Sequence, residues 1–125
     1  MIKLKIDSEN VKVGKSRGRG RGVFATTQIR ARQLVERCPV LVVPKSALDE
    51  FDEFAFEWTK HKVAVALGCG SLYNHSYEPN ARYKIHKGEN TISFVATKNI
   101  EPGEEIFVNY NGDPADQSPV WFDAK

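Results

Sequence analysis

The stretch from Leu72 to Asn80 constrains this chain most, because it places amides, an imidazole and a hydroxyl in one loop with a rigid exit. Pro79 fixes its own φ and holds the preceding residue extended. A loop of this kind can hold polar groups in one geometry, which a binding site requires. The alternative is that Asn74, His75 and Asn80 only satisfy the backbone of a turn through side-chain hydrogen bonds.

Length and composition predict one soluble domain. The chain has 125 residues, of which 41% are hydrophobic and 27% charged, enough to bury a core without a metal or disulfides. Its formal net charge of +2 is too small to indicate nucleic-acid binding. Met1 to Leu4 carry no apolar core of the length that a signal peptide needs, and no apolar run approaches the roughly 20 residues of a membrane span. We therefore expect a single domain over residues 1–125, with no membrane partner.

The two cysteines, Cys38 and Cys69, form no CxxC pair and no framework of bridges. This usage suits a reducing compartment, so we expect buried thiols in a cytoplasmic protein. A zinc site made from these thiols with His61 and His75 would lack the paired spacing of structural zinc modules. No metal is expected.

For most of the chain, the sequence predicts short strands joined by turns. Alternating or β-branched apolar residues predict strands within residues 1–13, 23–25, 33–43, 82–86, 91–96 and 106–110. Pro39 predicts a bulge or a sheet edge in the middle of the third. Residues 62–67 are too few for periodicity to separate a strand from a helical turn. A mostly β domain is the expected fold class.

One amphipathic helix is predicted from Ser46 to Trp58. Ser46 and Asp49 resemble an N-cap and its acidic partner, and apolar side chains follow at helical spacing. The aromatic residues of this segment are expected as core anchors. Its acidic residues could attract a basic substrate, although a solvated helix face is the alternative; they are Asp49, Glu50, Asp52, Glu53 and Glu57.

Three motifs stand in a fixed order: GRGVFA at residues 20–25, YNHSYEPN at 73–80 and GEEIFVNY at 103–110. Together they resemble the SET-domain protein lysine methyltransferases, and most closely the minimal viral and bacterial members that lack pre-SET and zinc-binding post-SET modules. The resemblance places the domain core at about residues 12–111. The tail 112–125 is expected to pack over the site or to form a dimer contact.

The resemblance implies small curved β-sheets, one short helical insert and a C-terminal pseudoknot, a topology that general rules treat as an exception. The Asn74–His75 stretch and the strand ending at Tyr110 would form the knot. S-adenosylmethionine would bind on one face, leaving S-adenosylhomocysteine as product. A lysine of a protein or peptide substrate would enter a narrow channel from the other face.

The resemblance also implies roles for individual residues. Tyr110 and His75 would be catalytic, with Tyr110 at the methyl-transfer centre. The cofactor would be held by Arg19, Gly20, Arg21, Gly22, Tyr73, Asn74, His75, Tyr110 and Trp121. The substrate channel would be lined by Cys38, Tyr83, Val108, Trp121 and Phe122.

Two departures from the family pattern affect this site. Cys38 stands where many members carry a second channel tyrosine, which leaves the channel wider or differently lined. The C-terminal zinc-binding cysteines of the family are missing. Trp121 and Phe122 are therefore the candidates for closing the channel or covering adenine, with a dimer contact as the alternative.

The chemistry explains why such a site is built this way. A lysine ammonium has a pKa of about 10.4, so forming the neutral amine near pH 7.4 costs roughly 4 kcal/mol. A narrow apolar channel and the positive sulfonium of the cofactor both lower that pKa. What remains is in-line alignment of nitrogen, methyl and sulfur, together with oxygens facing the methyl through C–H···O contacts. Tyr110 and backbone carbonyls suit that role.

Two other function classes remain open. Lys15, Arg17, Arg19 and Arg21 lie among glycines, as in segments that track phosphates, but no aromatic residues interleave them. The other class is a catalytically silent SET fold that acts as an interaction module. The expected substrate is a histone, a histone-like protein or a ribosomal protein, and contact with nucleic acid is expected only through it. Localisation would then be cytoplasmic, or at nucleoid or chromatin.

Overall fold

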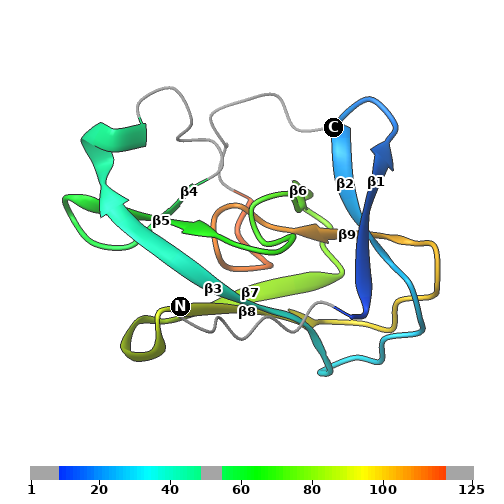
Figure 1. Ribbon diagram of the computed structural model, residues 1–125. Helices are drawn as coiled ribbons and strands as arrows, with labels where there is room; N and C mark the ends of the chain where they lie inside the picture. Colours follow the sequence, from blue (N-terminus) through cyan, green and yellow to red (C-terminus); the bar gives the residue numbers. More distant parts are fainter. Residues whose placement is uncertain (1–8, 49–54, 118–125) are drawn as a thin grey trace.

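The computed structural model describes residues 9–48 and 55–117 of the chain. Its strands form two sheets, one in the order β1-β2-β9-β6 and one in the order β4-β5-β3-β8-β7 (Figure 1). Helical structure in this part of the chain consists of short 3-10 turns. The mostly β fold class is therefore confirmed.

The first sheet brings together segments that are far apart in sequence. β1 (Val11–Ser16) and β2 (Gly20–Ala25) form an antiparallel hairpin. β9 (Glu105–Val108) pairs antiparallel with β2 and parallel with the two-residue strand β6 (Asn74–His75). β9 thus lies between the hairpin and β6, so the predicted pairing of Asn74–His75 with the segment leading to Tyr110 is confirmed.

The second sheet is built around the long strand β3 (Leu34–Pro44). Its first half pairs with β8 (Thr91–Ala96) and its second half with β5 (Lys62–Ala66). Pro39 is the last residue paired with β8. The predicted bulge at Pro39 is wrong, because the register shift lies between Leu34 and Glu36. The alternative of a sheet edge agrees with the pairing, since residues up to Pro39 pair with β8 and those from Val40 onward pair with β5.

The structure contradicts the helix predicted over residues 46–58 in the two parts of this segment that it describes. The 3-10 turn η1 (Lys45–Leu48) begins the segment, and residues 49–54, with four of the five acidic residues, lie outside the described part. Ala55–Glu57 form the strand β4, which pairs with β5. Pairing with an available strand edge overrode the local helical spacing of the apolar residues.

The other strand predictions are largely confirmed. β7 (Ala81–His86) and β8 form the expected hairpin around the 3-10 turn η3 (Lys87–Glu89). The segment 62–67, which periodicity left open, contains the strand β5 (Lys62–Ala66), and Gly103 takes the positive φ of +88° that its turn requires. The opening strand runs from Val11 to Ser16, while the alternating residues 2–6 lie outside the described part.

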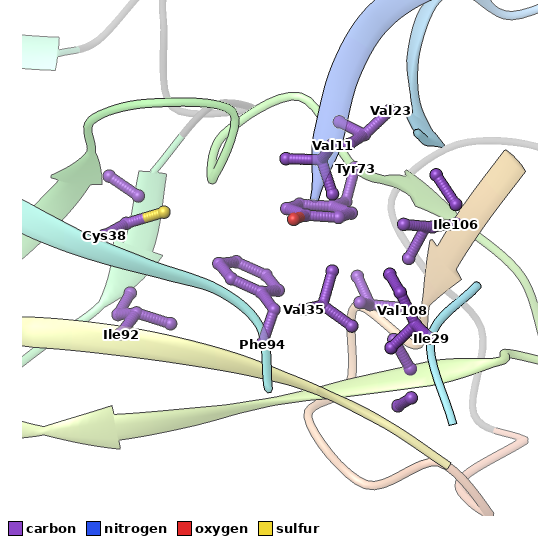
Figure 2. Close-up of a cluster of buried hydrophobic side chains, with 14 of the residues drawn as sticks. Val11, Val23, Ile29, Val35, Cys38, Tyr73, Ile92, Phe94, Ile106 and Val108 are labelled. Carbon is purple, nitrogen blue, oxygen red and sulfur yellow. The ribbon is translucent and has the colours of Figure 1, made fainter. Parts of the chain in front are cut away.

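The sheets enclose one hydrophobic core (Figure 2). Tyr73 stacks on Phe94 within it, with ring centroids 4.2 Å apart. Ile29 and Ile100 form an isolated bridge and are also fully buried. Cys38 is buried and Cys69 half-buried, and both are free thiols. No helix among the described residues is long and apolar enough to cross a membrane.

Candidate active site

The hairpin β1–β2 and the strand β6 are joined by the side chain of Asn74. Its Nδ2 donates to the carbonyl oxygen of Arg21 at 2.9 Å and to Glu105 Oε2 at 2.8 Å. Glu105 Oε1 accepts a bond of 2.7 Å from the hydroxyl of the buried Ser16. Since both hydrogens of Nδ2 are used, Asn74 can offer a ligand only its oxygen, which is an acceptor.

Gly22 allows this close approach. A Cβ at this position would overlap the Glu105 carboxylate and lie 3.0 Å from Asn74 Nδ2. The residue is buried in β2, which lies between β1 and β9. A larger residue at this position would have to displace the Glu105 carboxylate and the Asn74 amide from the hairpin backbone.

His75 is 3% exposed and faces Tyr110. Its Nδ1 accepts a hydrogen bond of 2.9 Å from the backbone N–H of Tyr110. An accepting Nδ1 carries no proton, so the neutral ring is protonated at Nε2. Burial lowers the pKa of His75, which favours the same neutral form. The imidazole thus fixes the backbone of Tyr110 and does not act as a cation.

Tyr110 is held through its side chain as well as its backbone. Its hydroxyl donates to the carbonyl oxygen of Tyr73 at 2.6 Å. Tyr83 donates a longer bond of 3.4 Å to the Tyr110 carbonyl. A phenol oxygen and a main-chain oxygen therefore lie side by side at a half-buried position. Such paired oxygens suit weak C–H···O contacts with a polarised methyl group.

Aromatic side chains continue from Tyr83 into the core. The ring of Phe56 packs edge-on against Tyr83, with centroids 5.0 Å apart, and Phe94 lies 6.3 Å from both rings. Burial, and then the charge of Glu57, raise the pKa of Tyr83, so its phenol stays neutral. Gly112, at φ +89°, brings the chain close to the Tyr83 hydroxyl.

The turn end of the hairpin reaches β9. The Arg19 guanidinium lies over the ring of Phe107, 5.1 Å from its centroid, and Phe107 is the β9 partner of Asn74. Gly20 has a φ of +76° where the turn enters β2. Arg19 is half-buried and Arg21 exposed, so the turn presents positive charge beside Asn74.

The predicted channel residues lie in different surroundings. Val108 is 1% exposed and pairs with His75 across β6 and β9. Cys38 has no exposed surface and lies in the core next to Glu36 and Gly70, so its role in a channel stays a prediction. Trp121 and Phe122 lie outside the described residues, as does the tail beyond position 117.

The structure thus connects most of the predicted site. Direct contacts or strand pairing link these predicted residues: Arg19, Arg21, Gly22, Tyr73, Asn74, His75, Tyr83, Val108 and Tyr110. Within residues 9–48 and 55–117, no group of three or more His, Cys, Asp or Glu side chains could hold a metal ion.

Sequence reasoning missed the residues that support this site. Glu105 belongs to the third motif, but nothing in the pattern assigned its carboxylate to Asn74. Phe56 was hidden inside the predicted helix. Glu36 carried the clearest available signal, since it is a lone acid in an apolar strand segment, and it is fully buried.

Comparisons with known proteins agree with this geometry. Residues 20–111 match the SET domain. The chain is 33% identical over 111 residues to "Histone-lysine N-methyltransferase, H3 lysine-37 specific" of Schizosaccharomyces pombe. That match covers 84% of this chain and 71% of the yeast protein.

Solved structures share the fold. A crystal structure of a candidate histone methyltransferase of Plasmodium falciparum superposes with a TM-score of 0.73 at 31% identity, covering 81% of this chain and 92% of that one. An inhibitor-bound humanized mutant of the Chaetomium thermophilum Polycomb Repressive Complex 2 gives 0.71 at 25% identity, covering 83% of this chain and 15% of that one. The same complex in an autoinhibited form bound to S-adenosylmethionine gives 0.70 at 22% identity, again covering 83% and 15%.

Proposed function

Because this chain belongs to the SET-domain family, whose members are protein lysine methyltransferases, we propose that it transfers a methyl group from S-adenosylmethionine to a lysine of a basic protein. Membership and the 33% identical yeast enzyme make the chain a protein lysine N-methyltransferase. The methyl donor and the substrate class are the proposal. The observation that carries it is the continuous set of contacts from Arg21 through Asn74 and β6 to Tyr110.

The residues beside Asn74 suit the amino-acid end of S-adenosylmethionine. Gly22 lets the side chains of Glu105 and Asn74 lie against the hairpin backbone, and Arg19 and Arg21 supply positive charge for a carboxylate. The oxygen of Asn74 can accept a hydrogen bond from an ammonium group. When bound there, the cofactor would supply the electrophilic methyl group.

The protein's own groups would prepare the lysine for reaction. The neutral aromatic side chains of Tyr83 and Phe56 disfavour a charged ammonium and so lower the pKa of the lysine amine. Tyr110 and the Tyr73 carbonyl would provide oxygens for weak C–H···O contacts with the methyl group of a bound cofactor. His75 keeps the Tyr110 backbone in place. In this arrangement, alignment of the reacting groups would supply much of the rate enhancement, because it can lower the activation barrier by several kcal/mol.

The proposal is tested by titration calorimetry with S-adenosylmethionine and S-adenosylhomocysteine, followed by radiolabelled methyl transfer to core histones and to ribosomal protein extract. We expect saturable binding that Asn74→Ala weakens by about tenfold, a loss of about 1.4 kcal/mol. Tyr110→Phe should reduce transfer by about 100-fold while binding changes little.

The alternative of a silent SET-fold interaction module predicts the opposite result. A folded protein that binds neither compound would contradict the proposal and favour that module. Binding without transfer to any lysine-bearing fraction would contradict the substrate class. If transfer requires intact nucleosomes and falls steeply with salt, contact with nucleic acid accompanies the substrate.

The cellular setting belongs to the proposal as well. Activity on a histone or histone-like protein would place the enzyme at chromatin or nucleoid, and activity on a ribosomal protein in the cytoplasm. A homodimer is proposed for the tail 112–125, and light scattering coupled to gel filtration checks it: a molecular mass near 14.1 kDa would contradict dimerisation.

A further inference from the structure

Glu36 carries a carboxylate with no exposed surface, in the first half of β3. Its Oε1 accepts a hydrogen bond of 2.7 Å from the Tyr73 hydroxyl. Its Oε2 accepts one of 2.9 Å from the backbone N–H of Cys69. Burial of a carboxylate is costly unless its oxygens are bonded in this way. An apolar residue would pack here without that cost, so the carboxylate calls for an explanation.

Both donors belong to one segment, Cys69 to Tyr73, which leads directly into Asn74 and β6. Tyr73 makes one hydrogen bond through its side chain and one through its backbone. Its side chain bonds to Glu36, and its carbonyl oxygen accepts the 2.6 Å bond from the Tyr110 hydroxyl. Tyr73 therefore connects a buried carboxylate of one sheet to the phenol that follows β9.

Packing and protonation keep this connection in place. The Tyr73 ring stacks on Phe94, with centroids 4.2 Å apart and ring planes 20° apart. In Figure 2 the Cys38 side chain points its sulfur toward Tyr73. Burial and the neighbouring Glu36 raise the pKa of Tyr73 and of Cys38, so both stay protonated and can donate to the carboxylate. For the same reasons the pKa of Cys69 rises to about 11.

We propose that Glu36 is a positioning residue for methyl transfer: it anchors Tyr73 so that the Tyr73 carbonyl holds the Tyr110 hydroxyl in its reactive place. The inference rests on the proposed function, in which Tyr110 lies at the methyl-transfer centre. Glu36 would act through Tyr73 and would touch neither cofactor nor lysine.

Two variants break the connection at different points. Glu36→Gln keeps the shape, but only one of its two polar atoms can accept a hydrogen bond. Tyr73→Phe keeps the ring stacking and the carbonyl and removes only the hydroxyl. Glu89→Gln is the matched control, because Glu89 is exposed in the turn between β7 and β8. Circular dichroism establishes that each variant is folded.

Kinetics provide the first readout. Because a misplacement of about 1 Å can cost up to about 100-fold, we expect kcat to fall by about 10- to 100-fold in each variant. The KM values for S-adenosylmethionine and for the substrate should change less than about threefold. The double variant should be no slower than the poorer single one, since both changes break the same connection. Glu89→Gln should match the wild type.

The Tyr110 ring provides a second readout that does not depend on activity. In a protein labelled at tyrosine ¹³Cζ, the Tyr110 resonance is identified by its absence in Tyr110→Phe. Its chemical shift should move in the same direction in Glu36→Gln and Tyr73→Phe, and stay in place in Glu89→Gln. If Glu36→Gln does not fold, Tyr73→Phe alone decides.

Wild-type kcat together with an unmoved Tyr110 resonance in folded Tyr73→Phe would overturn the inference. Failure of the proposed function gives a different result, namely no methyl transfer by the wild-type protein. In that event the resonance still decides whether Glu36 positions Tyr110, because it is measured without substrate.

Discussion

At the scale of single residues, hydrogen-bond direction determines what a side chain can do. The resemblance implied a catalytic role for His75, and histidines often act as general bases because their unperturbed pKa lies near neutrality. The Nδ1 of His75 instead accepts the Tyr110 N–H, and the residue is 3% exposed. If Nδ1 were protonated, its N–H would face the backbone N–H of Tyr110, and neither donor would have an acceptor in that contact. The imidazole of the folded protein is therefore a neutral acceptor that supports Tyr110.

This arrangement predicts a pH dependence of stability. Because burial lowers the pKa of His75 below its usual value of about 6.5, the unfolded chain binds a proton more readily than the folded chain. The contribution of His75 to the free energy of unfolding is complete above pH of about 6.5 and is lost as the pH falls toward the lowered pKa. Urea unfolding at about pH 8 and about pH 5.5 measures it.

The comparison needs two variants. His75→Gln keeps an acceptor for the Tyr110 N–H but does not titrate, so its stability should change less between the two pH values than that of the wild type. His61→Gln is the control, because His61 is exposed before β5. Equal pH dependence in His75→Gln and the wild type would assign the effect to other groups.

At the scale of elements, the site depends on how closely β2, β9 and β6 approach. Gly22 is the contact point, since its backbone lies against Glu105 and Asn74. Gly22→Ala should cost about 1–3 kcal/mol of unfolding free energy, because the added methyl overpacks this contact. It should also weaken S-adenosylmethionine binding by about tenfold, because Asn74 must move.

Gly88→Ala is the matched control for that substitution. A Cβ at Gly88 meets no atom within 4 Å, and its φ lies outside the positive region. Urea unfolding and calorimetric titration on both variants separate the effects. Unchanged stability and affinity in Gly22→Ala would show that Glu105 and Asn74 can move to accommodate the added methyl group.

The sequence allowed the elements to be predicted where local signals agree with tertiary pairing. The turn at Gly103 and the hairpin around Gly88 follow from residues that favour those conformations, and the structure contains both. The predicted helix is wrong because Ala55–Glu57 pair with the edge of β5. This tertiary pairing is not encoded in the local pattern of residues. Motif order brought Asn74 and Tyr110 together, but the partners of Glu36 and Glu105 are set by side-chain packing across both sheets.

At the scale of the whole molecule, the core and the candidate site share residues. Tyr73 is a core side chain stacked on Phe94, while its carbonyl holds Tyr110. Phe94 also contacts Phe56 and Tyr83. A core substitution here should therefore alter catalysis as well as stability, whereas one elsewhere should alter stability alone.

Phe94→Leu and Ile29→Val test this difference, because both residues are fully buried, but Phe94 stacks on Tyr73 whereas Ile29 forms the isolated bridge with Ile100. Phe94→Leu should lower the free energy of unfolding by about 1–3 kcal/mol and Ile29→Val by about 0.5–1.5 kcal/mol. Under conditions where both variants are folded, kcat should fall by about tenfold in Phe94→Leu and stay near the wild-type value in Ile29→Val. Methyl-transfer kinetics and urea unfolding on the same preparations measure both quantities. Equal kcat in the two variants would mean that the Tyr73 carbonyl keeps its position without the stacked ring, and that packing in this part of the core does not affect catalysis.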